Sequence, residues 1–189
     1  MKRLILARHG QTEWNIERRY QGQQDTELND FGRQQMKIMS QLLDGETIDQ
    51  IMTSPLKRAK ESAEIVARAC GLEVSVDYRL AEMDLGSWEG KPYATGRNIE
   101  NWFEQAPHGG ETGSRFHRRV QNWFVAQPPT EKTMLLVVHG LVVQSLLSYL
   151  LKEPFDSWHK RPVRNGALAV VTRKDWGWRL EKFNQEVAS

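Results

Sequence analysis

Two histidines and two arginines stand out as residues whose types and spacing could do chemistry. His9 and His139 each follow an apolar run, and each precedes a glycine. Arg8 adjoins the first histidine, and Arg58 lies in a segment of helical pattern. Guanidinium groups bind oxyanions through paired N–H donors, and no metal-binding carboxylate adjoins these residues. Together the four side chains favour an anion site, and phosphate suits them best.

The predicted elements bring these side chains to one edge of a sheet. Residues 2–7 and 133–138 are apolar runs typical of buried strands, and residues 48–53 predict a third strand. The first two runs end at the histidines, and the third leads into the helix that bears Arg58. Ligands of open α/β sheets bind beyond the carboxyl ends of the strands, so we expect the anion there.

Further elements surround these three strands. Asn29 is expected to cap a helix that Gly45 stops, and Ser54-Pro55 is expected to start a helix that runs to about Ala69. Additional strands are predicted at 72–76, at 167–172 and, at a sheet edge, at 178–183, with a helix at 141–151.

The alternation of strand and helix predicts the α/β class, as a three-layer α/β/α sandwich with a mostly parallel central sheet. Residues from about 86 to 130 differ, because they are rich in glycine, proline and aromatic residues, with helical periodicity near 97–105 and 114–126. We expect them to form a small helical lid inserted over the sheet. No linker divides the chain, so residues 1–189 are expected to form one domain.

The composition limits the classes of function. The 189 residues carry 26 Lys and Arg against 24 Asp and Glu, a net charge of +2 that gives no reason to expect a nucleic-acid partner. Polar residues interrupt the longest apolar region, 135–151, so no membrane partner is expected. The N-terminal apolar run is too short for a secretory signal, which predicts a cytoplasmic protein. The single cysteine, Cys70, cannot form an internal disulfide and is expected to be buried near a helix end.

Several blocks of residues follow one another along the chain. They are Leu6-Ala7-Arg8-His9-Gly10-Gln11-Thr12-Glu13-Trp14-Asn15; Gly22, Asp25, Leu28 and Gly32; Ser54-Pro55-Leu56-Lys57-Arg58-Ala59; Arg79-Leu80-Ala81-Glu82-Met83-Asp84-Leu85-Gly86-Ser87-Trp88-Glu89-Gly90; and Val137-Val138-His139-Gly140. In type and order these blocks resemble the motifs of the histidine phosphatase superfamily, also called phosphoglycerate mutase-like. The resemblance covers residues 4 to about 151.

The resemblance implies a role for each candidate site residue. His9 would be the nucleophile, attacking phosphorus as a neutral imidazole and becoming a phosphohistidine. Glu82 would protonate the leaving alcohol and then activate water, because a carboxyl beside bound phosphate holds its proton. A neutral His9 and a protonated Glu82 imply an acidic to neutral pH optimum. The residues implied to bind phosphate are Arg8, Asn15, Gln21, Gly22, Arg58 and His139, of which Arg8, Arg58 and His139 would also stabilise the transition state.

The function implied is that of a metal-independent phosphomonoesterase that needs no cofactor. Its partner would be a small phosphorylated metabolite of the sugar phosphate or α-ribazole phosphate type, and a fructose-2,6-bisphosphate type also fits. A phosphoglycerate mutase-type phosphoryl transfer and a non-catalytic phosphate-binding protein remain as alternatives. The mutases of the superfamily carry a longer lid than the short stretch between Glu82 and His139 allows, which favours hydrolysis. The oligomeric state stays open.

Other polar residues of the chain have weaker assignments. The cations of the predicted lid could meet a second negative group of a substrate, although solvated side chains are the favoured interpretation. Glu111 is expected to brace the pocket, and Gln11 has no interpretation from the sequence. The lid cations are Lys91, Arg97, Arg115, Arg118 and Arg119, and the histidines expected at the lid or surface are His108, His117 and His159.

Overall fold

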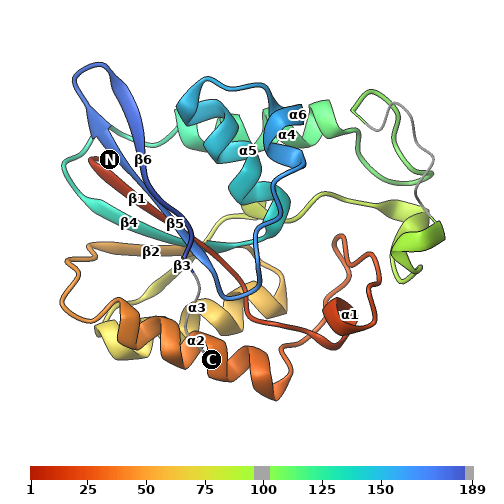
Figure 1. The fold of residues 1–189 in the computed structure, drawn as a ribbon, viewed down its shortest axis with the longest axis horizontal. Coiled ribbons are helices and arrows are strands. Elements are labelled where there is room, and N and C mark those ends of the chain that lie inside the picture. The colour runs from red at the N-terminus through yellow and green to blue at the C-terminus, as the bar shows by residue number, and fades with distance from the viewer. Residues whose placement is uncertain (96–102, 186–189) are drawn as a thin grey trace.

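The computed structural model describes residues 1–95 and 103–185, which form a six-stranded sheet between two layers of helices (Figure 1). The strand order is β3-β2-β4-β1-β5-β6. The first four strands of this order run parallel, and β5 and β6 are antiparallel to their neighbours. The strands are β1 (Arg3–Arg8), β2 (Gln50–Thr53), β3 (Val74–Val76), β4 (Thr133–Val138), β5 (Leu168–Lys174) and β6 (Gly177–Gln185).

The helices cover the two faces of this sheet and confirm the three-layer α/β/α prediction. In Figure 1, α2 (Asp30–Leu42) and α3 (Lys57–Cys70) lie below the sheet. On the upper face lie α4 (Gly113–Val125), α5 (Gly140–Leu151) and α6 (Phe155–His159). The short α1 (Glu13–Ile16) follows β1 on the side where the strands end. Alternate side chains of β1 and β4 enter the two cores, which explains why both strands read as continuous apolar runs.

The segment predicted as a lid divides into two parts. Its later half is α4, whose Phe116, Val120 and Trp123 are fully buried in the core between the sheet and the upper helices. The earlier half consists of single turns, η2 (Gly86–Trp88) and η3 (Tyr93–Thr95), and irregular chain. The predicted helix near 97–105 falls mostly outside the described residues. We call residues 77–95 and 103–112 the outer wall, because they border the cavity described below.

Two local predictions need correction. Helix α3 begins at Lys57 with Leu56 at its N-cap, so Ser54-Pro55 precedes the helix instead of starting it. Cys70 is the last residue of α3, as expected, but it is partly exposed instead of buried. The cap prediction for α2 is confirmed, since Asn29 Oδ1 accepts a hydrogen bond from the Gly32 N–H at 2.8 Å. Among the residues that the structure describes, no helix is long and apolar enough to cross a membrane.

Candidate active site

The adjacent strands β1 and β4 bring the two histidines together. The last residues of these strands, Arg8 and Val138, are paired in register, so the residues that follow them are neighbours. The backbone N–H of His9 donates to the Val138 carbonyl at 2.9 Å, and the rings of His9 and His139 lie edge to face with centroids 5.3 Å apart. Both side chains are buried.

The His9 ring is held in one orientation with one nitrogen available. Its Nδ1 lies 2.7 Å from the carbonyl oxygen of Gly10. A carbonyl only accepts hydrogen bonds, so Nδ1 carries the proton and Nε2 keeps its lone pair. Burial and the charges of Arg58 and Arg8 lower the pKa of His9 well below its ordinary value. The imidazole is therefore neutral and can act as a nucleophile at neutral pH.

Arg58 is buried beside His9, Arg8 is partly exposed there, and backbone carbonyls fix both side chains. Arg58 Nη1 donates to Gln24 O at 2.7 Å, and its Nη2 donates to Gly22 O at 2.8 Å. Arg8 Nη1 donates to Val163 O at 2.6 Å. Burial lowers the pKa of Arg58 to about 10, which still leaves the group charged at neutral pH.

Three buried nitrogens of this cluster have no hydrogen-bond partner within the described part of the chain. They are Arg8 Nε, Arg58 Nε and His139 Nδ1. His139 Nε2 is paired with Ser54 Oγ at 2.7 Å, so the ring is anchored on one side only, and Nδ1 carries the ring proton when the Ser54 hydroxyl donates to Nε2. Leaving a buried donor unpaired costs about 1–3 kcal/mol, more when it is charged, and several such donors around one point favour a bound oxyanion. We call Arg8, His9, Arg58 and His139 the strand-end cluster.

Glu82 faces the strand-end cluster from the outer wall. Its carboxyl oxygens accept hydrogen bonds from the backbone N–H groups of Met83 at 3.0 Å and Leu141 at 3.3 Å. Burial raises the pKa of Glu82, and this effect outweighs the opposing influence of those hydrogen bonds and of the two arginines. A carboxyl with a raised pKa beside a neutral imidazole is suited to donate a proton.

The strand-end cluster except His139, together with Glu82, lines a cavity of about 510 Å³. Gln21 and Gly22 also line it, as the sequence suggested, whereas Asn15 does not lie among its lining residues. The amide oxygen of Asn15 accepts hydrogen bonds from the Thr12 N–H and from Asn165 Nδ2, both at 3.1 Å, and so stabilises the turn after β1. Within the described residues, no three His, Cys, Asp or Glu side chains gather as a metal site would require.

A family model described as "Histidine phosphatase superfamily (branch 1)" matches residues 4–186. The chain belongs to this superfamily. It is 33% identical to the "Probable phosphoglycerate mutase GpmB" of Yersinia enterocolitica over 94% of this chain and 88% of that protein. A solved mycobacterial glucosyl-3-phosphoglycerate phosphatase in complex with VO3 is 31% identical, with a TM-score of 0.83 over 98% of this chain and 100% of that one. The α-ribazole phosphatase of Shigella flexneri is 27% identical, with a TM-score of 0.85 over 97% and 96% of the two chains. Phosphatase or mutase activity is therefore indicated.

In this member of the superfamily, the outer wall is fastened by an arginine that the sequence suggested would be solvated. Arg119, on α4, donates from Nη1 to the carbonyl oxygens of Arg79 and Ala81, both at 2.9 Å, and forms an ion pair with Glu111. Glu111 in turn accepts from the Asp84 N–H at 3.0 Å. Together, Glu111 and Arg119 therefore hold the chain on both sides of Glu82.

The other predicted lid cations do not approach the cavity within the described residues. Lys91, Arg115 and Arg118 are exposed and absent from its lining, and Arg97 lies outside the described residues. Among the remaining histidines, His159 lines the cavity, whereas His117 stacks on Phe155 away from it.

Sequence reasoning missed the residues that support this superfamily site. Ser54, interpreted as a helix cap, instead bonds His139. Asn165 Nδ2 donates to the His9 and Gly10 carbonyls at 3.2 and 3.3 Å and joins the segment before β5 to the turn after β1. Gln11, which had no interpretation, accepts from Asn29 Nδ2 at 3.0 Å and so fastens the same turn to α2. Only Ser54 carried a local signal, its place in the block that contains Arg58.

Proposed function

We propose that this chain is a metal-independent phosphomonoesterase that works through a phosphohistidine at His9. The observation that supports this proposal most directly is the set of unpaired buried donors around the neutral imidazole of His9, whose Nε2 lone pair is available. A phosphoryl group seated there accepts hydrogen bonds from Arg8, Arg58 and His139. These donors are preorganised for the charge that develops on the phosphoryl oxygens in the transition state.

In the first step, His9 Nε2 attacks phosphorus and the bond from phosphorus to the ester oxygen breaks. Glu82 gives its proton to the departing oxygen, so the product is a neutral alcohol and Glu82 becomes a carboxylate. In the second step, Glu82 accepts a proton from water, whose oxygen attacks phosphorus. The N–P bond breaks, inorganic phosphate leaves, and both side chains return to their starting states.

The second candidate is a mutase, which the name of the Yersinia relatives favours. A mutase keeps the phosphoryl group on His9 and returns it to another hydroxyl of the bound acid, so it needs a phosphorylated enzyme that resists water. Stimulation by a bisphosphate and interconversion of phosphoglycerates faster than their hydrolysis would support this candidate. Hydrolysis without a bisphosphate would support the phosphatase.

The test is hydrolysis of para-nitrophenyl phosphate in EDTA from pH 5 to 8, with His9→Ala beside the wild type. His108→Ala is a matched control, because His108 is an exposed histidine outside the cavity lining. Activity that survives EDTA, vanishes in His9→Ala and persists in the control supports the proposal. Turnover retained in His9→Ala would refute it, and phosphate binding without turnover of any monoester would favour the non-catalytic alternative.

A further inference from the structure

Beyond the strand-end cluster and Glu82, the cavity is lined by many further residues of different chemistry. Its volume of about 510 Å³ falls in the range of about 300–1,000 Å³ typical of sites for organic ligands, so it accommodates the alcohol part of an ester as well as the phosphate. Apart from its charged groups and a few polar residues such as Gln21 and Gln144, the cavity lining is mainly apolar and aromatic. The apolar and aromatic lining residues are Tyr20, Met83, Leu85, Trp88, Tyr93, Pro107, Leu141, Pro162 and Val163.

Three aromatic rings of this lining form one cluster. The ring centroid of Tyr20 lies 5.6 Å from that of Trp88 and 4.8 Å from that of Tyr93. Backbone hydrogen bonds fasten the cluster, because the Tyr20 N–H donates to Lys91 O at 2.9 Å and the Gly90 N–H donates to Tyr20 O at 2.8 Å. A rigid aromatic surface in a cavity wall favours a flat apolar ligand group, which gains contact without a large ordering cost.

The positive charge of the described cavity lining is confined to the strand-end cluster. Arg8 and Arg58 are its cations, and both lie beside His9. Burial lowers the pKa of His159, also in the lining, so its imidazole stays neutral at pH 7. A second anionic group on the substrate would lose water without gaining a cation from this described lining, which is unfavourable.

Two basic residues of the surrounding segments are engaged elsewhere. Arg119 is paired with Glu111. Arg161 lies over the Trp158 ring at 4.4 Å and pairs with Glu153 at 3.3 Å. These contacts keep both guanidiniums turned to protein partners.

We infer that the substrate is a phosphate monoester of an uncharged alcohol that carries an aromatic or similarly flat apolar group. The inference rests on the proposed phosphatase function and narrows it. It disfavours phosphorylated carboxylic acids and bisphosphates, each of which adds a second negative group. The aromatic cluster selects the alcohol, and the strand-end cluster binds the phosphate.

The first experiment compares kcat/KM for three synthetic monoesters: benzyl, 4-carboxybenzyl and ethyl phosphate. All are esters of alkyl alcohols, so each needs a proton from Glu82 on departure. Benzyl phosphate is expected to exceed ethyl phosphate by roughly tenfold, from contact with the aromatic cluster. It should exceed 4-carboxybenzyl phosphate by roughly tenfold or more, because that carboxylate meets no cation. Equal or faster turnover of the carboxylate, or benzyl no faster than ethyl, overturns the inference.

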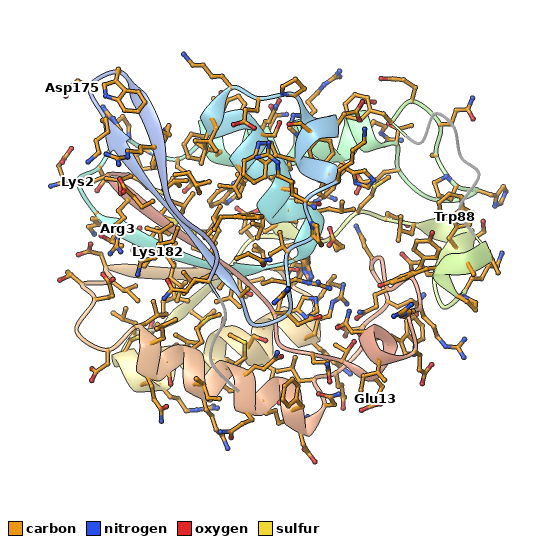
Figure 2. The ribbon with its side chains drawn as sticks, in the orientation of Figure 1. Lys2, Arg3, Glu13, Trp88, Asp175 and Lys182 are labelled. Carbon is orange, nitrogen blue, oxygen red and sulfur yellow. The ribbon has the colours of Figure 1, made fainter. Side chains whose placement is uncertain are left out.

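The second experiment removes one flat ring while keeping apolar volume. Trp88→Leu is expected to lower the ratio of kcat/KM for benzyl phosphate to that for ethyl phosphate roughly fivefold to tenfold. The matched control is Trp176→Leu. Trp176 is 71% exposed and follows Asp175 in the turn between β5 and β6, and Figure 2 shows Asp175 at the opposite end of the molecule from Trp88. If Trp88→Leu lowers kcat/KM equally for both esters, the Trp88 ring has only a structural role, and the inference is overturned.

The outcomes separate this inference from the proposed function. If none of the three esters nor para-nitrophenyl phosphate is hydrolysed above the His9→Ala level, the phosphatase proposal fails, and the substrate class fails with it. If hydrolysis depends on His9 but prefers the carboxylate, the phosphatase stands and the substrate class alone is wrong.

Discussion

The strand-end cluster and the outer wall meet at one cavity, yet they are held in different ways. The cluster is anchored by β1, β4 and α3, whose backbone is fixed by sheet pairing and buried packing. The outer wall is irregular chain, held by side-chain contacts such as the Arg119–Glu111 pair and by Glu89, which accepts from the Gln23 N–H at 2.7 Å.

This difference separates two tasks. The groups that would bind and transfer phosphate lie on elements that cannot move without disturbing the core. The groups that would meet the alcohol, and Glu82 itself, lie mostly on irregular chain outside the sheet, which is held by loop hydrogen bonds, an ion pair and the buried side chains of Leu80 and Met83. Substrate choice can therefore change through the outer wall while the phosphate chemistry stays in place.

The largest effect is expected from His9→Ala, which removes the proposed nucleophile from the strand-end cluster. We expect kcat for para-nitrophenyl phosphate to fall by on the order of 10⁴-fold or more, as for loss of a nucleophile elsewhere. The circular dichroism spectrum should not change, because the strands either side of the cavity remain paired. Substantial activity in this variant would show that the cluster does not carry the chemistry.

Glu82→Gln tests the outer wall in the same manner. The amide cannot donate the proton that an alkyl alcohol needs, so kcat for benzyl phosphate should fall by about 10²–10⁴-fold. para-Nitrophenolate leaves without a proton, so the first step with that ester should be far less affected. Burst kinetics with both esters measure this contrast, and an equal loss of the first step on both would place the acid elsewhere.

The pH profile follows from the opposite pKa shifts of the two regions. The lowered pKa of His9 keeps its nucleophile neutral from neutral pH down into the acidic range. The raised pKa of Glu82 keeps its proton above pH 4.5, and activity should fall roughly tenfold per pH unit once the pH passes that raised value. The alkaline fall should disappear in Glu82→Gln. A wild-type profile of kcat/KM for benzyl phosphate that rises steadily to pH 9 would contradict both assignments.

One substitution made in both regions gives a matched pair. A Cβ on Gly10 would lie 2.3 Å from Gly32 O, in the backbone between β1 and α2, so Gly10→Ala should lower the free energy of unfolding by about 1–3 kcal/mol. A Cβ on Gly86 would lie 2.4 Å from His108 O, within the outer wall. Gly86→Ala should mainly raise KM for benzyl phosphate, with a smaller change in stability. Urea unfolding and steady-state kinetics measure both, and the reverse pattern would refute the division.

The smallest effect is expected from Arg119, which positions Glu82 without facing the reacting atoms. Arg119→Ala should lower kcat for benzyl phosphate several-fold and alter the alkaline limb of the pH profile, because two backbone carbonyls and Glu111 lose their partner. Arg119→Lys should recover part of this loss. The exposed Arg118, next along α4, provides the control as Arg118→Ala. If Arg119→Ala changes the free energy of unfolding but leaves kcat and the pH profile unchanged, Arg119 does not position Glu82.

The strand-end cluster was easier to predict from the sequence than its supports. Two apolar runs, each ending at a histidine, placed His9 and His139 at one sheet edge, and the parallel register of β1 and β4 bears out that placement. Ser54 carries the signal of a helix cap, which is indistinguishable from that of a partner for His139. Asn165 and Arg119 bond to backbone carbonyls distant in the chain, and such contacts leave no periodic pattern. The antiparallel direction of β5 could not be derived, because an apolar run has no direction.

The central claim is that His9 carries the phosphoryl group during turnover. The most direct measurement mixes Glu82→Gln with para-nitrophenyl phosphate, quenches in alkali because phosphohistidine is labile to acid, and locates the added phosphate by peptide mass spectrometry. Glu82→Gln is chosen because slow attack by water lets the intermediate accumulate. The account predicts a phosphoryl group on the peptide that contains His9, absent when His9→Ala is combined with Glu82→Gln. A phosphoryl group on another residue, or sustained turnover with none on His9, would contradict it.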